Sequence, residues 1–181
     1  MIQAQRRRVN QKLYQAELLL KAAQQSENEL NLVAWQQACH EAALNALEAA
    51  QLAFLREVAA VYRLPVQAVS RPEDLQNLAE ERQQRLPELQ HLQGAWRDPV
   101  HPLSRLEPAL KALRQTPAAD EAPQAGEWMP EFAEETQPSL IPLVAEEDFA
   151  SLEEKQLAEA SLMLKALKEL LQELREQLLE Q

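Results

Sequence analysis

Glycine, cysteine and β-branched residues are all scarce in this chain. The 181 residues include two glycines, Gly94 and Gly126, and no Walker-type or Rossmann-type glycine spacing can be drawn through them. Phosphate-cradling loops of those two kinds are therefore excluded. Val, Ile and Thr together contribute only twelve residues, so the residues that favour strands and tight hairpins are too few for a β fold. The single cysteine, Cys39, can form neither an internal disulfide nor a thiolate zinc site.

Residues that favour helices fill the chain instead. Ala, Leu, Glu, Gln and Arg lose the least on entering a helix, so the composition predicts an all-α fold. The most apolar window, residues 42–61, includes five charged or amide side chains and is expected to be a buried helix rather than a membrane span. No signal-peptide core follows the arginines at 6–8, so we expect a cytoplasmic protein.

Charge divides the chain into three parts. Residues 1–116 carry fourteen Lys and Arg against thirteen Asp and Glu, residues 117–148 carry none against nine, and residues 149–181 carry four against seven. The middle block also has five of the eleven prolines. This pattern predicts a helical bundle domain at 1–116, a disordered acidic linker at 117–148 and an amphipathic helix at 149–181.

Capping residues and prolines mark the expected ends of four helices within residues 1–116. The first runs over 3–24, and the second starts at a capping box at 26–29 and ends near residue 63, before Pro65. A third starts at Ser70, with Pro87 expected to kink or restart it, and a fourth starts at Ser104. Joined by short connections, these helices predict a compact four-helix bundle.

An apolar seam runs along the last thirty residues. It consists of positions spaced by three and four residues, namely Leu157, Ala160, Leu164, Leu167, Leu171, Leu174 and Leu178. Such a seam must be buried. Met163 and Leu170 widen it beyond a strict dimer seam, which favours docking into a groove between helices, either of the same chain or of a second subunit. A parallel two-stranded coiled coil is the alternative.

The acidic block contains large apolar side chains. Trp128 and Phe132 stand among acidic residues in one short stretch, and Leu140, Ile141 and Phe149 follow. Apolar residues in a solvated segment often dock on a partner or on their own domain. We expect docking on the chain's own domain, with a partner motif as the alternative.

Residues suited to chemistry are few and scattered. Cys39 and His40 are adjacent on a predicted helix, so their side chains diverge and cannot act as nucleophile and base. His91 and His101 have no carboxylate or cysteine at ligand spacing, so no metal and no cofactor is expected. The basic triplet at 6–8 is expected to be solvated or paired with the linker, because an acidic chain repels nucleic acid.

Two resemblances add to this interpretation. The stretch RVNQKLYQAELLL at 8–20, with the helix ending VYRLP at 61–65, resembles a small gammaproteobacterial family of unknown function. That resemblance covers about the first hundred residues and implies a bacterial, cytoplasmic, helical protein without catalytic residues. The alanine-rich stretch at 34–50 and the Arg85 to His91 spacing loosely resemble helical ribonuclease domains of the HEPN class, although Pro87 interrupts that spacing.

Taken together, the residues predict a non-enzymatic interaction or adaptor module. Its protein partner, or a second copy, would bind through the C-terminal helix, and neither nucleic acid nor membrane is expected as a partner. The interaction residues would be the six leucines of the seam together with Trp128 and Phe132. A HEPN-like ribonuclease or RNA-binding domain is the alternative.

Overall fold

The computed structural model describes residues 1–25, 32–115 and 146–179, with side chains described at 1–25, 32–115 and 154–178. The helices are α1 (Ile2–Gln24), α2 (Leu32–Val61), α3 (Pro72–Glu81), α4 (Pro87–Arg97), α5 (Leu106–Arg114) and α6 (Glu146–Leu179), with short 3₁₀ turns η2 (Val66–Ala68) and η3 (Pro102–Arg105). The described residues contain no strand, which confirms the all-α prediction.

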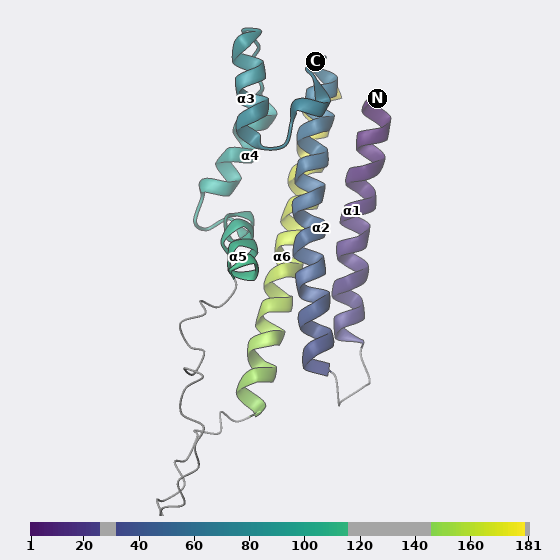
Figure 1. Cartoon of the computed structure of the whole chain (residues 1–181), viewed down its shortest axis with the longest axis vertical. Coiled ribbons are helices and arrows are strands. Elements are labelled where there is room, and N and C mark those ends of the chain that lie inside the picture. The colour runs from purple at the N-terminus through teal and green to yellow at the C-terminus, as the bar shows by residue number, and fades with distance from the viewer. Residues whose placement is uncertain (26–31, 116–145, 180–181) are drawn as a thin grey trace, which may run out of the picture.

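Three long helices, α1, α2 and α6, lie side by side, and the short helices α3, α4 and α5 follow one another along α2 (Figure 1). The five apolar residues spaced at three and four positions along α1 are all buried: Val9, Leu13, Ala16, Leu20 and Ala23. On α2 the buried positions include the small residues Ala43, Ala46, Ala50 and Ala53. Small side chains let helices approach closely, which suits α2 to a central place between α1 and α6.

Helix ends are formed without glycine. Arg63 and Gln83, each two residues past the end of α2 and α3, adopt left-handed backbone conformations with φ of 56° and 54°. At each end the following amide bonds back to a carbonyl five residues earlier: Leu64 N to Ala59 O at 2.8 Å and Gln84 N to Ala79 O at 2.9 Å. This is the Schellman arrangement, in which glycine is usual. Two glycines therefore suffice for a chain with this many helix ends.

Pro87 decides how many helices precede the linker. It occupies the first turn of α4, so residues 70–97 form two helices rather than one kinked helix. The described residues before 116 thus form two long and three short helices, and α6 supplies the third long one. At α3 the capping carboxylate is Asp74, which accepts the amides of Ser70 and Arg71, both at 2.9 Å.

The predicted linker at 117–148 falls largely outside the described residues, but its last three residues, 146–148, already belong to α6. No helix in the described part of the chain has a stretch both long and apolar enough to cross a bilayer.

Candidate interaction surfaces

The apolar seam of α6 is buried within the same chain. Leu157, Ala160, Leu164, Leu167, Leu171 and Leu174 are all buried, and Leu178 near the helix end is half-buried. α6 contacts α2, α1 and η3. Met163, one of the two residues that widen the seam, is also buried, and Leu170 packs partly against the core. The groove that receives the seam is therefore formed by the chain's own helices.

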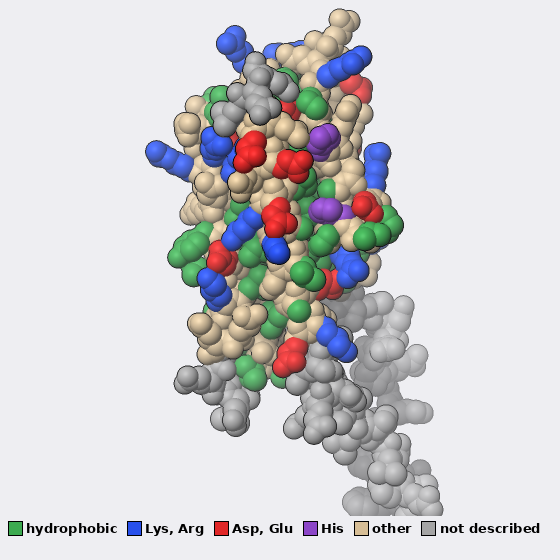
Figure 2. Space-filling view, turned by 180° about the vertical axis from the view of Figure 1, so that it is seen from behind, with side chains coloured by type: hydrophobic (Ala, Val, Ile, Leu, Met, Phe, Trp, Pro, Cys, Tyr) green, Lys and Arg blue, Asp and Glu red, His purple; other side chains and the backbone are tan. Residues whose placement is uncertain are grey.

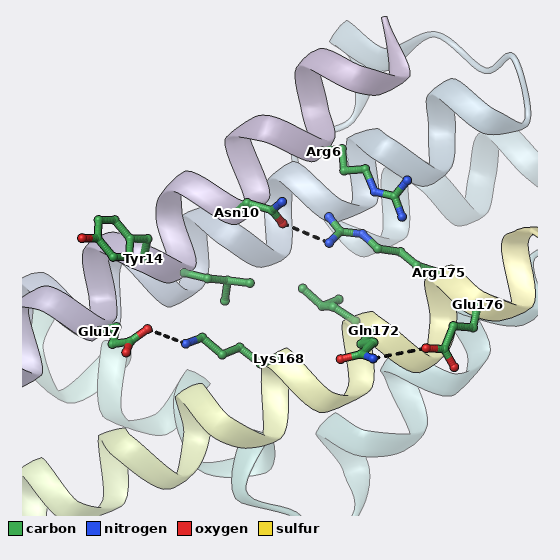
Figure 3. Close-up of a pocket in the computed structure, with 10 residues that line it drawn as sticks. Arg6, Asn10, Tyr14, Glu17, Lys168, Gln172, Arg175 and Glu176 are labelled. Carbon is green, nitrogen blue, oxygen red and sulfur yellow. Dashed lines mark hydrogen bonds and ion pairs between the residues drawn. The ribbon is translucent and has the colours of Figure 1, made fainter.

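A buried ion pair fixes the C-terminal part of α6. Glu57 of α2 has a side chain only 3% exposed, and Arg175 of α6 is 13% exposed. Arg175 donates from Nε to Glu57 Oε1 at 3.1 Å and from Nη2 to Oε2 at 2.7 Å, a two-pronged contact that demands a fixed geometry. Arg175 also donates from Nη1 to Asn10 Oδ1 at 3.0 Å, and Arg6 Nε lies 3.7 Å from Glu57 Oε1. One charged cluster thereby joins α1, α2 and α6. Figure 3 shows its residues Arg6, Asn10 and Arg175.

An open groove runs between α1 and α6. It contains two hollows of about 560 and 460 Å³, and both are lined by Glu17 and Lys168. The Nζ of Lys168 lies 2.7 Å from Oε2 of Glu17, so this ion pair crosses the groove where the hollows meet (Figure 3). Leu13 and Leu171 line the larger hollow and Leu20 and Leu164 the smaller. We call this feature the α1–α6 groove.

The charges on the walls of the α1–α6 groove are mostly paired. Hydrogen bonds from Lys168 and Lys21 hold the pKa of Glu17 down at about 2. The hydrogen bond between Lys21 and Glu17 also raises the pKa of Lys21. Tyr14 lies at the rim of the larger hollow, where its side chain is 60% exposed. Leu18, one turn further along α1, is exposed as well.

On the face seen from behind, the described residues form no patch dominated by one sign of charge. Lys and Arg side chains alternate with Asp and Glu, and apolar side chains lie between them (Figure 2). A mixed surface of this kind suits contact with a protein better than contact with a polyanion.

A second groove lies on the other side of α2. It is bounded by α2, α4 and α5, encloses about 810 Å³ and includes Trp96 and Gln115 among its lining residues. Arg114 at its edge pairs with Glu48. We call it the α2–α5 groove.

A family model for a family of unknown function, DUF6586, matches residues 1–181. The chain belongs to DUF6586. This confirms the resemblance to a helical family of unknown function. No curated protein and no solved structure matches the DUF6586 chain.

Residues suited to chemistry stay apart in the DUF6586 chain. Cys39 is buried, and burial raises the pKa of its thiol. His40 is half-buried, and loss of solvation lowers its pKa, opposed by Glu41 and Glu159. His101 accepts the Leu103 amide through Nδ1 at 3.2 Å, a structural role at the start of η3. No group of His, Cys, Asp and Glu in the described ranges could hold a metal ion.

Arg85 and His91 are both exposed, but they do not share a helix. Arg85 precedes α4, whose first residue is Pro87, whereas His91 lies on α4 itself. Nearby, the buried carboxylate of Glu88 accepts the Tyr62 hydroxyl at 3.1 and 3.2 Å. Burial, followed by the charge of Glu88, raises the pKa of Tyr62 to about 12.

Two predicted interaction residues, Trp128 and Phe132, lie outside the described residues. Conversely, sequence analysis missed Glu57, Arg175 and Tyr14. Glu57 lies in a largely apolar stretch of α2, with the buried Leu55 two residues before it and the buried Val58 directly after it. A charged residue inside an apolar run was the available signal, because such a residue is seldom buried without a partner.

Proposed function

We propose that this protein is a non-enzymatic helical module that binds a protein partner along the α1–α6 groove. The observation that carries the proposal is the groove itself: an apolar floor between two helices, with charged walls of both signs and an exposed tyrosine at its rim. Grooves of this composition accept an amphipathic helix, whose apolar stripe covers the floor. The seam of α6 serves the fold, and the outer flank of α6 serves binding.

Tyr14 is the expected anchor of the partner. Tyrosine offers a large apolar ring with a polar tip and is enriched among residues that dominate binding energy. The paired Glu17 and Lys168 beside it would set the partner's register rather than its affinity, since charges at an interface mostly fix orientation. We place this activity in the bacterial cytoplasm.

The test is affinity capture from native bacterial extract with three forms of the full chain: wild type, Tyr14→Glu and Leu113→Glu. Leu113 is an exposed leucine on α5, away from the α1–α6 groove, and provides the matched control. The expected result is a protein captured by wild type and Leu113→Glu and depleted at least tenfold with Tyr14→Glu, at equal melting temperatures. Equal capture by all three forms would refute the groove assignment.

The ribonuclease alternative has one observation in its favour, the exposure of Arg85 and His91. We expect Arg85→Ala and His91→Ala to leave RNA binding and RNA integrity unchanged in assays with purified protein. An RNA-cleaving activity of the wild type that disappears in both single variants would favour the ribonuclease instead.

A further inference from the structure

The α2–α5 groove differs from the α1–α6 groove in having unsatisfied polar groups. Gln51 lines it, and the buried Nε2 of Gln51 has no hydrogen-bond acceptor among the described residues. A buried donor without an acceptor is uncommon in a native structure and calls for an explanation. An occupant with a carbonyl or carboxylate oxygen would supply the missing acceptor.

Three cations of the α2–α5 groove also lack a partner. Arg71, Arg97 and Lys111 line it, and within the described part of the chain none of them has a carboxylate within 4 Å. Two lining carboxylates, Glu73 and Glu107, have no ion-pair partner among the described residues either, so the unpaired cations outnumber the unpaired acids by three to two. In the α1–α6 groove, by contrast, Lys168 and Arg175 both have carboxylate partners. The floor is apolar and is formed by Leu52, Leu103 and Leu106, with Trp96 beside them. The groove therefore suits a chain that carries both acids and large apolar side chains.

We propose that residues 126–132 of the same chain occupy the α2–α5 groove. Gln115, the last described residue after α5, is itself a lining residue, so the chain leaves the described structure at the edge of the groove. Ten residues lie between it and residue 126, and the eleven Cα-to-Cα steps span roughly 36 Å when extended. Fourteen more lead from residue 132 to α6, which passes along η3, an element that also lines the groove.

The composition of 126–132 matches the groove. Trp128 and Phe132 offer large rings for the apolar floor, and Glu127 and Glu131 offer carboxylates to the free cations. No Lys or Arg occurs anywhere in 117–148 to oppose them. Tethering raises the effective concentration of such a segment to about the millimolar range, so even a weak contact would be populated.

Hydrogen–deuterium exchange on the full chain tests the proposal. Residues 126–132 should exchange at least tenfold more slowly in wild type than in the variant Arg97→Glu/Lys111→Glu. The control Lys155→Glu/Lys165→Glu makes the same change in net charge at exposed positions of α6 and should keep the protection. Exchange in wild type at the rate of a free peptide would overturn the proposal, as would protection that survives the groove variant or disappears equally in the control.

A second arm separates docking within one chain from exchange between copies. The variant Trp128→Ala/Phe132→Ala should leave the groove empty, so a labelled peptide of residues 124–135 should bind it at least tenfold more tightly than it binds wild type. Equal peptide affinity for both forms would overturn the proposal. Protection of 126–132 in wild type should be the same at protein concentrations a hundredfold apart, and protection that rises with concentration would assign the segment to a second copy instead. Neither experiment involves Tyr14, so a result that overturns docking of residues 126–132 leaves the proposed function standing.

Discussion

The Glu57–Arg175 pair is the most buried of the ion pairs that fix the register of α6. Its two hydrogen bonds are made only when Arg175 stands opposite Glu57, whereas a leucine seam tolerates a shift along the helix more readily. Buried ion pairs contribute little net stability compared with apolar residues, but removal of one partner leaves the other charge buried and unpaired. The cluster therefore specifies position more than it stabilises.

Arg175→Ala is expected to lower the free energy of unfolding by about 3–5 kcal/mol, because it removes both hydrogen bonds to the buried Glu57 carboxylate and leaves only the longer contact with Arg6, at 3.7 Å. Arg105→Ala removes the exposed pair with Glu159 and should cost less than about 1 kcal/mol. Urea denaturation of both variants provides the comparison. The double variant Glu57→Leu/Arg175→Met should be more stable than Arg175→Ala alone. Equal losses in Arg175→Ala and Arg105→Ala would mean that the buried pair is unimportant.

Glu17 gives the protein a defined response to acid. Its folded pKa of about 2 lies below the ordinary value of 4.5, so its ion pair contributes fully above pH 4.5 and is lost as the pH falls toward 2. The difference in unfolding free energy between wild type and Glu17→Gln should therefore be largest near neutral pH and vanish near pH 2. Denaturant titrations at several pH values measure it. A difference that persists unchanged at pH 2 would contradict the ion-pair explanation.

At the scale of elements, α6 is held by its seam along most of its described length. The seam leucines contact α2 and α1, and among residues 154–178, whose side chains the structure describes, only Met163 is buried besides the seam. Tertiary packing, rather than intrinsic propensity, supplies most of the stability of such an amphipathic helix.

Leu171→Ala is expected to cost about 2–5 kcal/mol, since the side chain is fully buried and its loss leaves a cavity. Leu162 lies on the same helix but is 57% exposed, so Leu162→Ala should change stability by less than about 0.5 kcal/mol. Thermal unfolding followed by circular dichroism compares the two. Similar effects at both positions would place the seam elsewhere on the helix.

At the scale of the whole molecule, the burial of the seam within the chain predicts the effect of disrupting the seam. The double variant Leu164→Glu/Leu171→Glu places two charges in the core and should undock α6. Because the groove that receives the seam belongs to the same chain, the melting temperature should fall while the mass by light scattering stays that of wild type. A fall in mass would show instead that the seam also joins two subunits in solution.

The sequence by itself determined the helical class, the inward face of α1 and the apolar stripe of α6. All three follow from local spacing and composition, which the 3.6-residue repeat translates directly into faces. The family match over the whole chain agrees with the helical resemblance noted from residues 8–20 and 61–65.

Only the tertiary structure decided what the stripe of α6 packs against and which polar residues meet. Arg175 lies 118 positions after Glu57 and 165 positions after Asn10 in the chain. No local sequence pattern could therefore predict that they meet. The two grooves likewise depend on how α6 and the short helices after Pro87 lie along α2. Helix periodicity states which residues of a helix must be covered, whereas the identity of the covering surface depends on contacts between segments far apart in sequence.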